Sequence, residues 1–244
     1  MTARAIETEA VSDGGQLGAQ QLRSIPDYLQ RNYWWAYVHP SAVRVFERQW
    51  LVNFILCGNF ALLRDAALDE LGPAIHGRSL QVACVYGDFS AMLAERLAPG
   101  SRLDVVDVLP IQLQNLRRKL TASMPVTLYH RDSTALGFDD CSYDQAIIFF
   151  LLHEQPLPVR KKTLAEALRV IKPGGKLVIV DYHRPAYINP LRYLLWPPLR
   201  ALEPSALDLW NHDIGDWLPS EVVVERIRKR TFCGGLYQKL VIRV

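Results

Sequence analysis

Carboxylate and imidazole side chains stand directly after short apolar runs between residues 100 and 185. Asp107 ends the run RLDVVD, Asp132 follows VTLYH, and Asp181 ends KLVIVD. His153 and Glu154 follow the apolar run YDQAIIFFLL. Carboxylates accept hydrogen bonds from ligand hydroxyl groups, and a histidine can transfer protons near neutral pH. These five residues are therefore the first candidates for a binding or catalytic site.

The apolar runs that would position these side chains alternate with segments of helical period. Strand-like runs begin at Ser79, Arg102, Val126, Tyr143 and Lys176, and helical segments begin at Phe89, Ile111 and Val159. This alternation predicts βαβ units with a parallel sheet and right-handed crossovers. Ligands of such sheets bind at the carboxyl ends of the strands, so the candidates would share one edge. The final runs, VERIRKRTF and LYQKLVIRV, flank a Gly-Gly turn and predict an antiparallel pair that closes the sheet.

The composition is that of a globular chain. It has 244 residues, of which 50% are hydrophobic and 22% charged, and this excludes a disordered or fibrous protein. The four cysteines form no close pair, which argues against a zinc ribbon or a disulfide scaffold and indicates the reducing cytoplasm. A net charge of +3 does not indicate nucleic-acid binding. No apolar stretch reaches the ~20 residues that span a bilayer, so we expect no integral membrane protein.

Three regions differ in character along the chain. Residues 1–24 have no apolar period and are expected to form a disordered tail. Residues 25–72 form an aromatic and helical extension, with a helix expected from about Ser41 to Leu71 before the stop signal Gly72-Pro73. Residues 73–244 hold the α/β domain, with an insertion around residues 184–218. The proline-rich part of this insertion fits neither a strand nor a long helix, and such segments often cover a ligand crevice.

The first strand–turn–helix of the domain reads LQVACVYGDFS, from Leu80 to Ser90. Only Gly87 is a glycine, so the run is not the G-x-G-x-x-G of dinucleotide-binding proteins. A pyrophosphate needs close backbone approach at this turn, and Val85 and Tyr86 would block it.

This run resembles the first motif of class I S-adenosylmethionine-dependent methyltransferases, LDVACGTGDFS. It departs from that motif at Gln81, Val85 and Tyr86. Two later segments also resemble motifs of that family: LGFDDCSYDQ is similar to LPFxDxSFDxV, and RVIKPGGKLVIVD to RVLKPGGxLxIxD. Together with Asp107 and Asp132-Ser133, which end the second and third strands as in that family, these make five matches in order from about Leu80 to Asp181.

The resemblance implies a Rossmann-like domain with a mostly parallel, seven-stranded sheet flanked by helices. It implies S-adenosylmethionine as the cofactor, with Asp107 accepting the ribose hydroxyl groups and Asp132-Ser133 contacting the adenine. The implied cofactor-binding residues are Ala83, Cys84, Val85, Tyr86, Gly87, Asp88, Asp107, Val108, Gln112, Asp132, Ser133 and Phe149.

Nearly all of the chain after Pro26 also resembles the RquA family of rhodoquinone biosynthesis. The likeness rests on YWWAYVHP, VACVYGD, DVVDVLPIQLQNLRRKL, FFLLHEQP and KPGGKLVIVDYHRP, while KRTFCGGLYQKLVI is similar to the end of the ubiquinone/menaquinone C-methyltransferases. It implies that the substrate is ubiquinone and that a ring methoxy group is replaced by an amino group, giving rhodoquinone. It also implies that S-adenosylmethionine supplies the amine and that a divalent metal, manganese, takes part.

Tyr86, His153 and His183 are the candidate catalytic residues in this light. Tyr86 either reshapes the pocket so that the α-amino group of the cofactor faces the quinone, or simply packs. A neutral imidazole at His153 or His183 could deprotonate the attacking amine, with a structural role as the alternative. His153, Glu154, Asp181 and His183 also offer ligands for a manganese-like ion. Their spacing is not a metal signature, so the metal ligands stay unknown.

Two other functions remain open. The first is an ordinary quinone C- or O-methyltransferase. The second is a catalytically inactive protein that binds a quinone or scaffolds a complex, which the altered turn would suit. The retained Asp107 and Asp132 speak against this second alternative, because a protein that binds no cofactor gains little from them.

Aromatic residues outside the motifs favour contact with lipid or with the tail of a quinone. Residue types that are common at membrane interfaces occur at Tyr33, Trp34, Trp35 and Tyr37, and again in the region 187–204. Such a cluster can instead hold a helix against the core. We expect a cytoplasmic protein bound peripherally to the inner membrane, with no nucleic-acid partner.

Overall fold

The computed structural model describes residues 25–32 and 40–244. The expected tail of residues 1–24 and the aromatic residues from Tyr33 to Tyr37 lie outside this part of the chain. In the described part, one seven-stranded sheet has the order β3-β2-β1-β4-β5-β7-β6. Only β7 runs antiparallel to its neighbours β5 and β6. This arrangement confirms the expected Rossmann-like fold with its mostly parallel sheet.

Each strand follows one of the expected apolar runs. The strands are β1 (Arg78–Val82), β2 (Arg102–Asp107), β3 (Val126–His130), β4 (Tyr143–Phe149), β5 (Ile171–Tyr182), β6 (Arg226–Phe232) and β7 (Tyr237–Arg243). The helices are α2 (Asp27–Asn32), α3 (Pro40–Phe46), α4 (Gln49–Ile55), α5 (Phe60–Leu71), α6 (Phe89–Glu95), α7 (Pro110–Lys119), α8 (Leu157–Arg169), α9 (Leu191–Leu202) and α10 (Asp208–Asn211), with short 3₁₀ turns η2 (Pro204–Leu207) and η3 (Ile214–Trp217).

The central strands are buried on both faces. Leu80 and Val82 of β1 and Leu177 to Val180 of β5 are fully buried. Strands covered by helices on both faces read as continuous apolar runs, which explains why the sequence shows them so clearly. The core therefore fixes the strand ends, and the side chains that follow these ends inherit that fixed position.

The expected helix from Ser41 to Leu71 is wrong, because the chain forms three helices there. Two turns interrupt it, one after α3 and one between α4 and α5. Gly58 adopts a left-handed φ of 79° in the second turn, and Asn53 accepts a hydrogen bond from the backbone N–H of Phe60 through its Oδ1. Helices α4 and α5 meet at a bend of 92°. This bend separates α5, which packs on the core, from the exposed α4.

By length and composition, no single helix in residues 25–32 and 40–244 could cross a membrane. The bent pair of α4 and α5 would pass that test only when the two helices are counted together.

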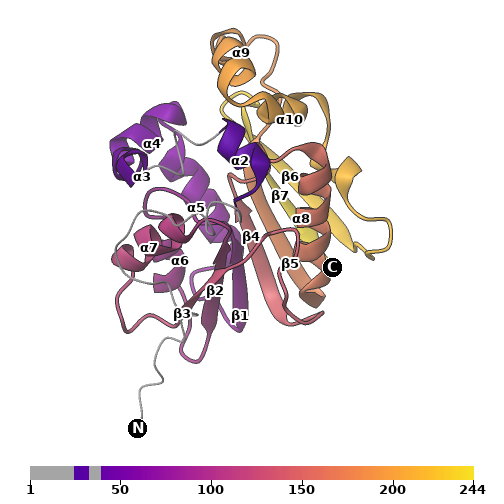
Figure 1. Ribbon diagram of the computed structural model, residues 1–244. Coiled ribbons are helices and arrows are strands. Elements are labelled where there is room, and N and C mark those ends of the chain that lie inside the picture. The colour runs from indigo at the N-terminus through magenta and orange to yellow at the C-terminus, as the bar shows by residue number, and fades with distance from the viewer. Residues whose placement is uncertain (1–24, 33–39) are drawn as a thin grey trace.

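The proline-rich insertion contains a helix that the sequence analysis did not predict. Helix α9 spans 12 residues and includes Pro197 and Pro198. Leu195 and Leu199 contact the core at a spacing of four residues, and this one-sided packing holds the helix despite the missing backbone donors. Figure 1 shows α9, α4 and α2 above the same end of the sheet.

Candidate active site

A cavity of about 1050 Å³ lies at the carboxyl ends of the central strands. Loops after β1, β2, β3 and β4 form its floor, and residues of α2, α4 and α9 line its upper part. Most lining side chains are apolar, with a few carboxylate, amide and imidazole groups among them. This combination is typical of a site for a largely apolar ligand that is oriented by a few polar contacts.

Asp107 is a buried carboxylate in the floor of this cavity. Its Oδ2 accepts a hydrogen bond from the backbone N–H of Cys84 at 2.7 Å, and its Oδ1 accepts one from Leu109 at 2.8 Å. Burial raises the pKa of Asp107 to about 6, although the two backbone donors oppose this shift. Each carboxylate oxygen can accept a further hydrogen bond. The group is therefore suited to bind two adjacent hydroxyl groups such as those of a ribose.

The turn after β3 places Asp132 and Ser133 in the cavity wall. Asp132 holds its own turn, because its Oδ1 accepts hydrogen bonds from the N–H and Oγ1 of Thr134. Ser133 accepts a hydrogen bond from Nε2 of Gln155 at 3.0 Å. The two residues thus form a fixed polar corner beside Asp107.

Ten of the twelve expected cofactor-binding residues line the cavity; Gly87 and Asp88 are outside its lining. Asp88 forms an ion pair with Nη1 of Arg64 at 2.7 Å. Gly87 has a φ of 83°, and a Cβ there would stand 2.8 Å from the ring of Phe60. Both residues therefore lie outside the cavity lining and make contacts that hold the turn.

The turn between β1 and α6 is filled by the side chains of Val85 and Tyr86. The Tyr86 ring stacks on Phe46 with a centroid distance of 6.0 Å, and its hydroxyl oxygen accepts a hydrogen bond from Nε2 of Gln112 at 2.8 Å. Lys119 holds the same turn by donating from Nζ to the carbonyl oxygen of Gly87 at 2.8 Å. Burial raises the pKa of Tyr86, so the phenol stays protonated at neutral pH. The bulky turn is a fixed part of the cavity wall.

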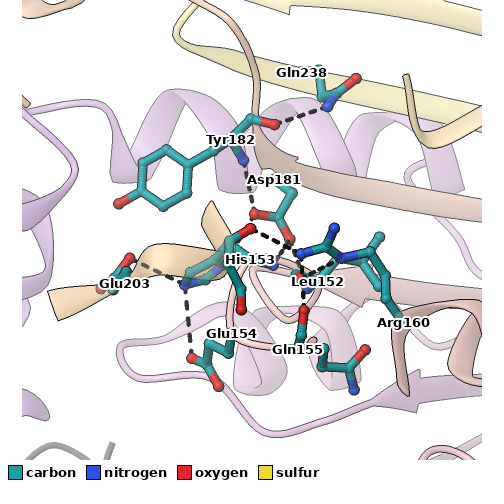
Figure 2. Close-up of polar contacts among 10 residues, drawn as sticks. Leu152, His153, Glu154, Gln155, Arg160, Asp181, Tyr182, Glu203 and Gln238 are labelled. Carbon is teal, nitrogen blue, oxygen red and sulfur yellow. Dashed lines mark hydrogen bonds and ion pairs between the residues drawn. The ribbon is translucent and has the colours of Figure 1, made fainter. Parts of the chain in front are cut away.

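His153 is a buried imidazole on the loop after β4, and Asp181 at the end of β5 orients it (Figure 2). Nδ1 of His153 lies 3.0 Å from Oδ1 of Asp181. The same carboxyl group accepts hydrogen bonds from the backbone N–H groups of Leu152, at 2.8 Å, and of Tyr182, at 2.8 Å. A carboxylate only accepts, so Nδ1 carries the hydrogen. Nε2 is therefore the ring nitrogen that can change its protonation.

Two glutamates face that nitrogen. Oε1 of Glu154 and Oε2 of Glu203 each lie 3.8 Å from Nε2 of His153, as the dashed lines in Figure 2 show. Burial alone would lower the pKa of His153, but Asp181, Glu203 and Glu154 together raise it to about 9. From the sequence, this residue was either a neutral imidazole that could act as a base or a structural histidine. The carboxylates instead favour an imidazolium, which acts as a proton donor at neutral pH.

Arg160 fixes the loop that carries His153. This fully buried guanidinium donates from Nε to the carbonyl oxygen of Leu152 and from Nη2 to those of Gln155 and Ser205, each at 2.9 Å. Ser205 belongs to η2, directly after α9. Arg160 therefore ties the loop after β4 to the insertion that carries Glu203.

His183 does not join this site. It lines a separate pocket together with His212, Asp213 and Lys229, and its Nδ1 contacts the carbonyl oxygen of Gly235 at 2.8 Å. The ligand set that the sequence offered for a manganese-like ion is therefore not assembled. Within residues 25–32 and 40–244, no group of three or more His, Cys, Asp or Glu side chains could hold a metal ion.

The structure adds two residues that the sequence analysis missed. Glu203 lies at the end of α9, 50 positions after His153 (203 − 153). Tyr28 of α2 lines the cavity, and its pKa is raised by burial and by the nearby Glu154. No motif marks either residue. The only available signal was the proline-rich insertion around Glu203, which indicated a cover over the crevice.

Comparison with known proteins agrees with the fold. Residues 80–175 match the family model described as "Methyltransferase domain". A demethylmenaquinone methyltransferase of Clavibacter sepedonicus is 32% identical over 194 residues, which cover 75% of this chain and 76% of that protein. The chain belongs to the class I S-adenosylmethionine-dependent methyltransferase family. A demethylmenaquinone methyltransferase of Staphylococcus aureus (strain JH9) is 28% identical over 135 residues, about half the length of each protein (55% of both).

Solved structures of methyltransferases share the fold of this protein. The N-methyltransferase NodS from Bradyrhizobium japonicum, in complex with S-adenosyl-L-homocysteine, is 15% identical with a TM-score of 0.52, covering 75% of this chain and 84% of that chain. A SAM-dependent methyltransferase from Aquifex aeolicus is 18% identical with a TM-score of 0.51, covering 84% of this chain and 97% of that chain. At these identities the likeness concerns the fold alone.

Proposed function

We propose that this methyltransferase-family protein acts on a quinone and converts ubiquinone to rhodoquinone, with S-adenosylmethionine as the donor of the amino group. The names of the relatives above, demethylmenaquinone methyltransferases, support a quinone as the substrate class. The apolar upper part of the cavity supports a ligand with a hydrocarbon tail. The finer assignment to rhodoquinone rests on the resemblance to the RquA family and on the filled turn.

The filled turn is the observation that carries the proposal. A methyl transfer needs the sulfonium methyl group in line with the attacking atom, and the turn after β1 helps to set that geometry. Val85 and Tyr86 occupy this turn, and Tyr86 is held by Gln112 and Phe46. Their bulk displaces the amino-acid end of the cofactor from the position that a glycine turn would give it. We infer that the α-amino group, rather than the methyl group, then faces the quinone.

The residues around His153 support amination of an oxidised ring. S-adenosylmethionine, when bound, would supply the nitrogen: its α-amino group would bond to the ring carbon while the methoxy group departs as methanol. Release of the amino group also requires that the bond between this nitrogen and the cofactor Cα breaks. Transfer of two electrons from the Cα–N unit to the quinone, with loss of the Cα proton, would give an imine, and water would cleave its C=N bond to release the aminated quinol and a 2-oxo acid. Negative charge develops on the quinone oxygen as that bond forms. An imidazolium at His153, held by Asp181 and facing the cavity through Nε2, can donate a hydrogen bond to this oxygen. Asp107 and the corner at Asp132 would hold the nucleoside.

No step of this proposal passes through a metal. The manganese that the resemblance implies does not fit the donor atoms of the described residues, because Asp181 is already engaged by His153 and by backbone N–H groups and His183 lies in another pocket.

Methylation of a quinone ring carbon is the second candidate function. The 32% sequence identity with a demethylmenaquinone methyltransferase favours it. The two reactions use different atoms of the cofactor. We would incubate the protein with ubiquinone and two preparations of S-adenosylmethionine, labelled at the α-amino nitrogen or at the methyl carbon. The proposal predicts that only the nitrogen label enters the quinone product seen by mass spectrometry. Methyl label in the quinone would instead support the second candidate.

The variant Tyr86→Thr tests the role of the filled turn. It restores the residue of the methyltransferase motif and should lower amination by at least tenfold while binding of S-adenosylhomocysteine persists in calorimetry. Val223→Thr, at an exposed residue outside the cavity lining, is the control. Unchanged amination by Tyr86→Thr would contradict the proposed role.

A further inference from the structure

The outer face of α9 and the loop before it expose large apolar side chains. Ile188 is 92% exposed, Tyr187 77%, Tyr193 57% and Trp196 44%. None of the four lines the cavity. Exposed apolar side chains that gather in one place mark a surface for binding a protein or a membrane.

The same face borders the mouth of the cavity. Leu194 and Leu202 of α9 line the cavity and are also largely exposed. Trp50 and Phe54 of α4 also line the cavity and are also largely exposed. Helices α4 and α9 both stand above the same end of the sheet (Figure 1). An apolar ligand that enters between α4 and α9 would therefore cross a rim of apolar side chains.

The charge of this face is positive. Helix α9 holds two arginines and no acidic residue. The guanidinium of Arg192 lies over the ring of Tyr187 at 5.7 Å, and that of Arg200 lies over Trp196 at 5.0 Å. Among the residues that the structure describes, no carboxylate forms an ion pair with Arg192 or Arg200. Aromatic rings paired with unneutralised arginines suit the boundary between lipid headgroups and acyl chains.

We propose that the outer face of α9, with Tyr187 and Ile188, docks on the surface of an anionic lipid bilayer, so that the mouth between α4 and α9 opens into the membrane. A tailed substrate could then reach the cavity without crossing water. The role of the surface in substrate delivery rests on the proposed function, whereas docking itself does not require a quinone. A second copy of this chain is the other occupant that such a face could accept.

Sedimentation with vesicles tests the docking directly. We would measure binding of the full chain to phosphatidylcholine vesicles with about one third phosphatidylglycerol, and to vesicles of phosphatidylcholine alone. The variant Arg192→Gln/Arg200→Gln should bind the anionic vesicles about thirtyfold more weakly, because each arginine near such a surface contributes about a fivefold gain. The variant Ile188→Ser/Tyr193→Ser/Trp196→Ser should lose at least tenfold on removal of its buried apolar area.

Two control variants match these changes on another surface. Arg226→Gln/Arg230→Gln removes two arginines of the exposed strand β6, and Val223→Ser/Ile227→Ser removes one exposed apolar side chain before this strand and one within it. Both should bind like the original chain. Equal loss in the control variants, or no binding by the original chain, would overturn the inference. The inference would also be overturned if sedimentation equilibrium showed a dimer that only the α9 variants disrupt.

A water-soluble short-chain ubiquinone separates this inference from the proposed function. The α9 variants should convert it at the original rate and convert a long-tailed ubiquinone in vesicles at least tenfold more slowly. If the original chain binds vesicles but aminates neither quinone, the proposed function fails and the docking surface stands. If the chain aminates both quinones and the α9 variants act on both at the original rate, the docking surface fails and the proposed function stands.

Discussion

Single side chains decide what the cavity can bind and which protons it can move. Asp107 presents a buried carboxylate, and His153 is held between three carboxylates. The sequence predicted the first from its place at the end of the apolar run RLDVVD. It predicted the position of the second but not its charge, because Glu203 comes from a distant part of the chain. A residue's protonation depends on neighbours that only the folded chain brings together.

The variant Asp107→Asn should weaken binding of S-adenosylhomocysteine by about tenfold to a hundredfold, since it replaces charge-assisted hydrogen bonds to hydroxyl groups by neutral ones. Isothermal titration calorimetry measures this loss. The exposed Asp139→Asn, in the loop before β4, should bind like the original chain. Equal affinity of the Asp107 and Asp139 variants would show that Asp107 does not hold the nucleoside.

The raised pKa of His153 predicts a pH-dependent stability. The folded pKa of about 9 lies above the ordinary histidine value of 6.5, so the stabilisation is fully present below about pH 6.5 and is lost as the pH rises through about 9. The contribution is at most about 3 kcal/mol. Urea unfolding at several pH values should show this loss in the original chain and not in His153→Gln. Parallel pH curves of the two proteins would contradict the assigned charge.

Glu203→Gln should lower the pKa of His153, because it removes one of the carboxylates that favour the imidazolium. Nuclear magnetic resonance of labelled histidine rings would follow this titration, with His153→Gln identifying the signal. Glu221→Gln, which changes an exposed carboxylate outside the cavity lining, is the matched control. A titration of His153 that is the same in all three proteins would exclude Glu203 as its partner.

At the scale of elements, the sequence predicted those parts that depend on local pattern. The buried strands and the hairpin at Gly234-Gly235 followed from continuous apolar runs and turn residues. The helix boundaries in residues 41–71 did not, because a turn at Gly58 interrupts a helical period that continues on both sides. Helix α9 was missed because tertiary packing at Leu195 and Leu199 outweighs two prolines.

The turn before α6 gives a prediction at this scale. Gly87→Ala should destabilise the fold by more than Gly100→Ala, although both glycines have similar positive φ angles, 83° and 81°. The alanine at position 87 would also meet the Phe60 ring at 2.8 Å, whereas no atom lies within 4 Å of a Cβ at position 100. Strain alone costs about 1 kcal/mol, and the ring contact should add to it. Equal unfolding free energies of the two variants would refute this packing.

In the whole molecule, one sheet edge gathers a floor of loop residues with the Asp107 carboxylate, a histidine held among carboxylates, and an apolar mouth. The floor is shared with the family, which is why the sequence motifs predicted ten of the residues that line the cavity. The mouth belongs to α4 and α9, which have no motif. The proline-rich composition around residues 184–218 indicated a cover over the crevice, but only the fold shows that α9 and α4 line the same cavity, because the two helices lie far apart in the chain.

A crystal structure with S-adenosylmethionine and a short-chain ubiquinone would show which atom of the cofactor meets the quinone ring. We expect the ribose hydroxyl groups to bind the carboxylate of Asp107 and the quinone oxygen to lie near Nε2 of His153. We expect the α-amino nitrogen, rather than the sulfonium methyl group, to lie beside the ring carbon that carries the methoxy group. A complex with the methyl group pointing at the ring, or with the ribose away from Asp107, would contradict these expectations.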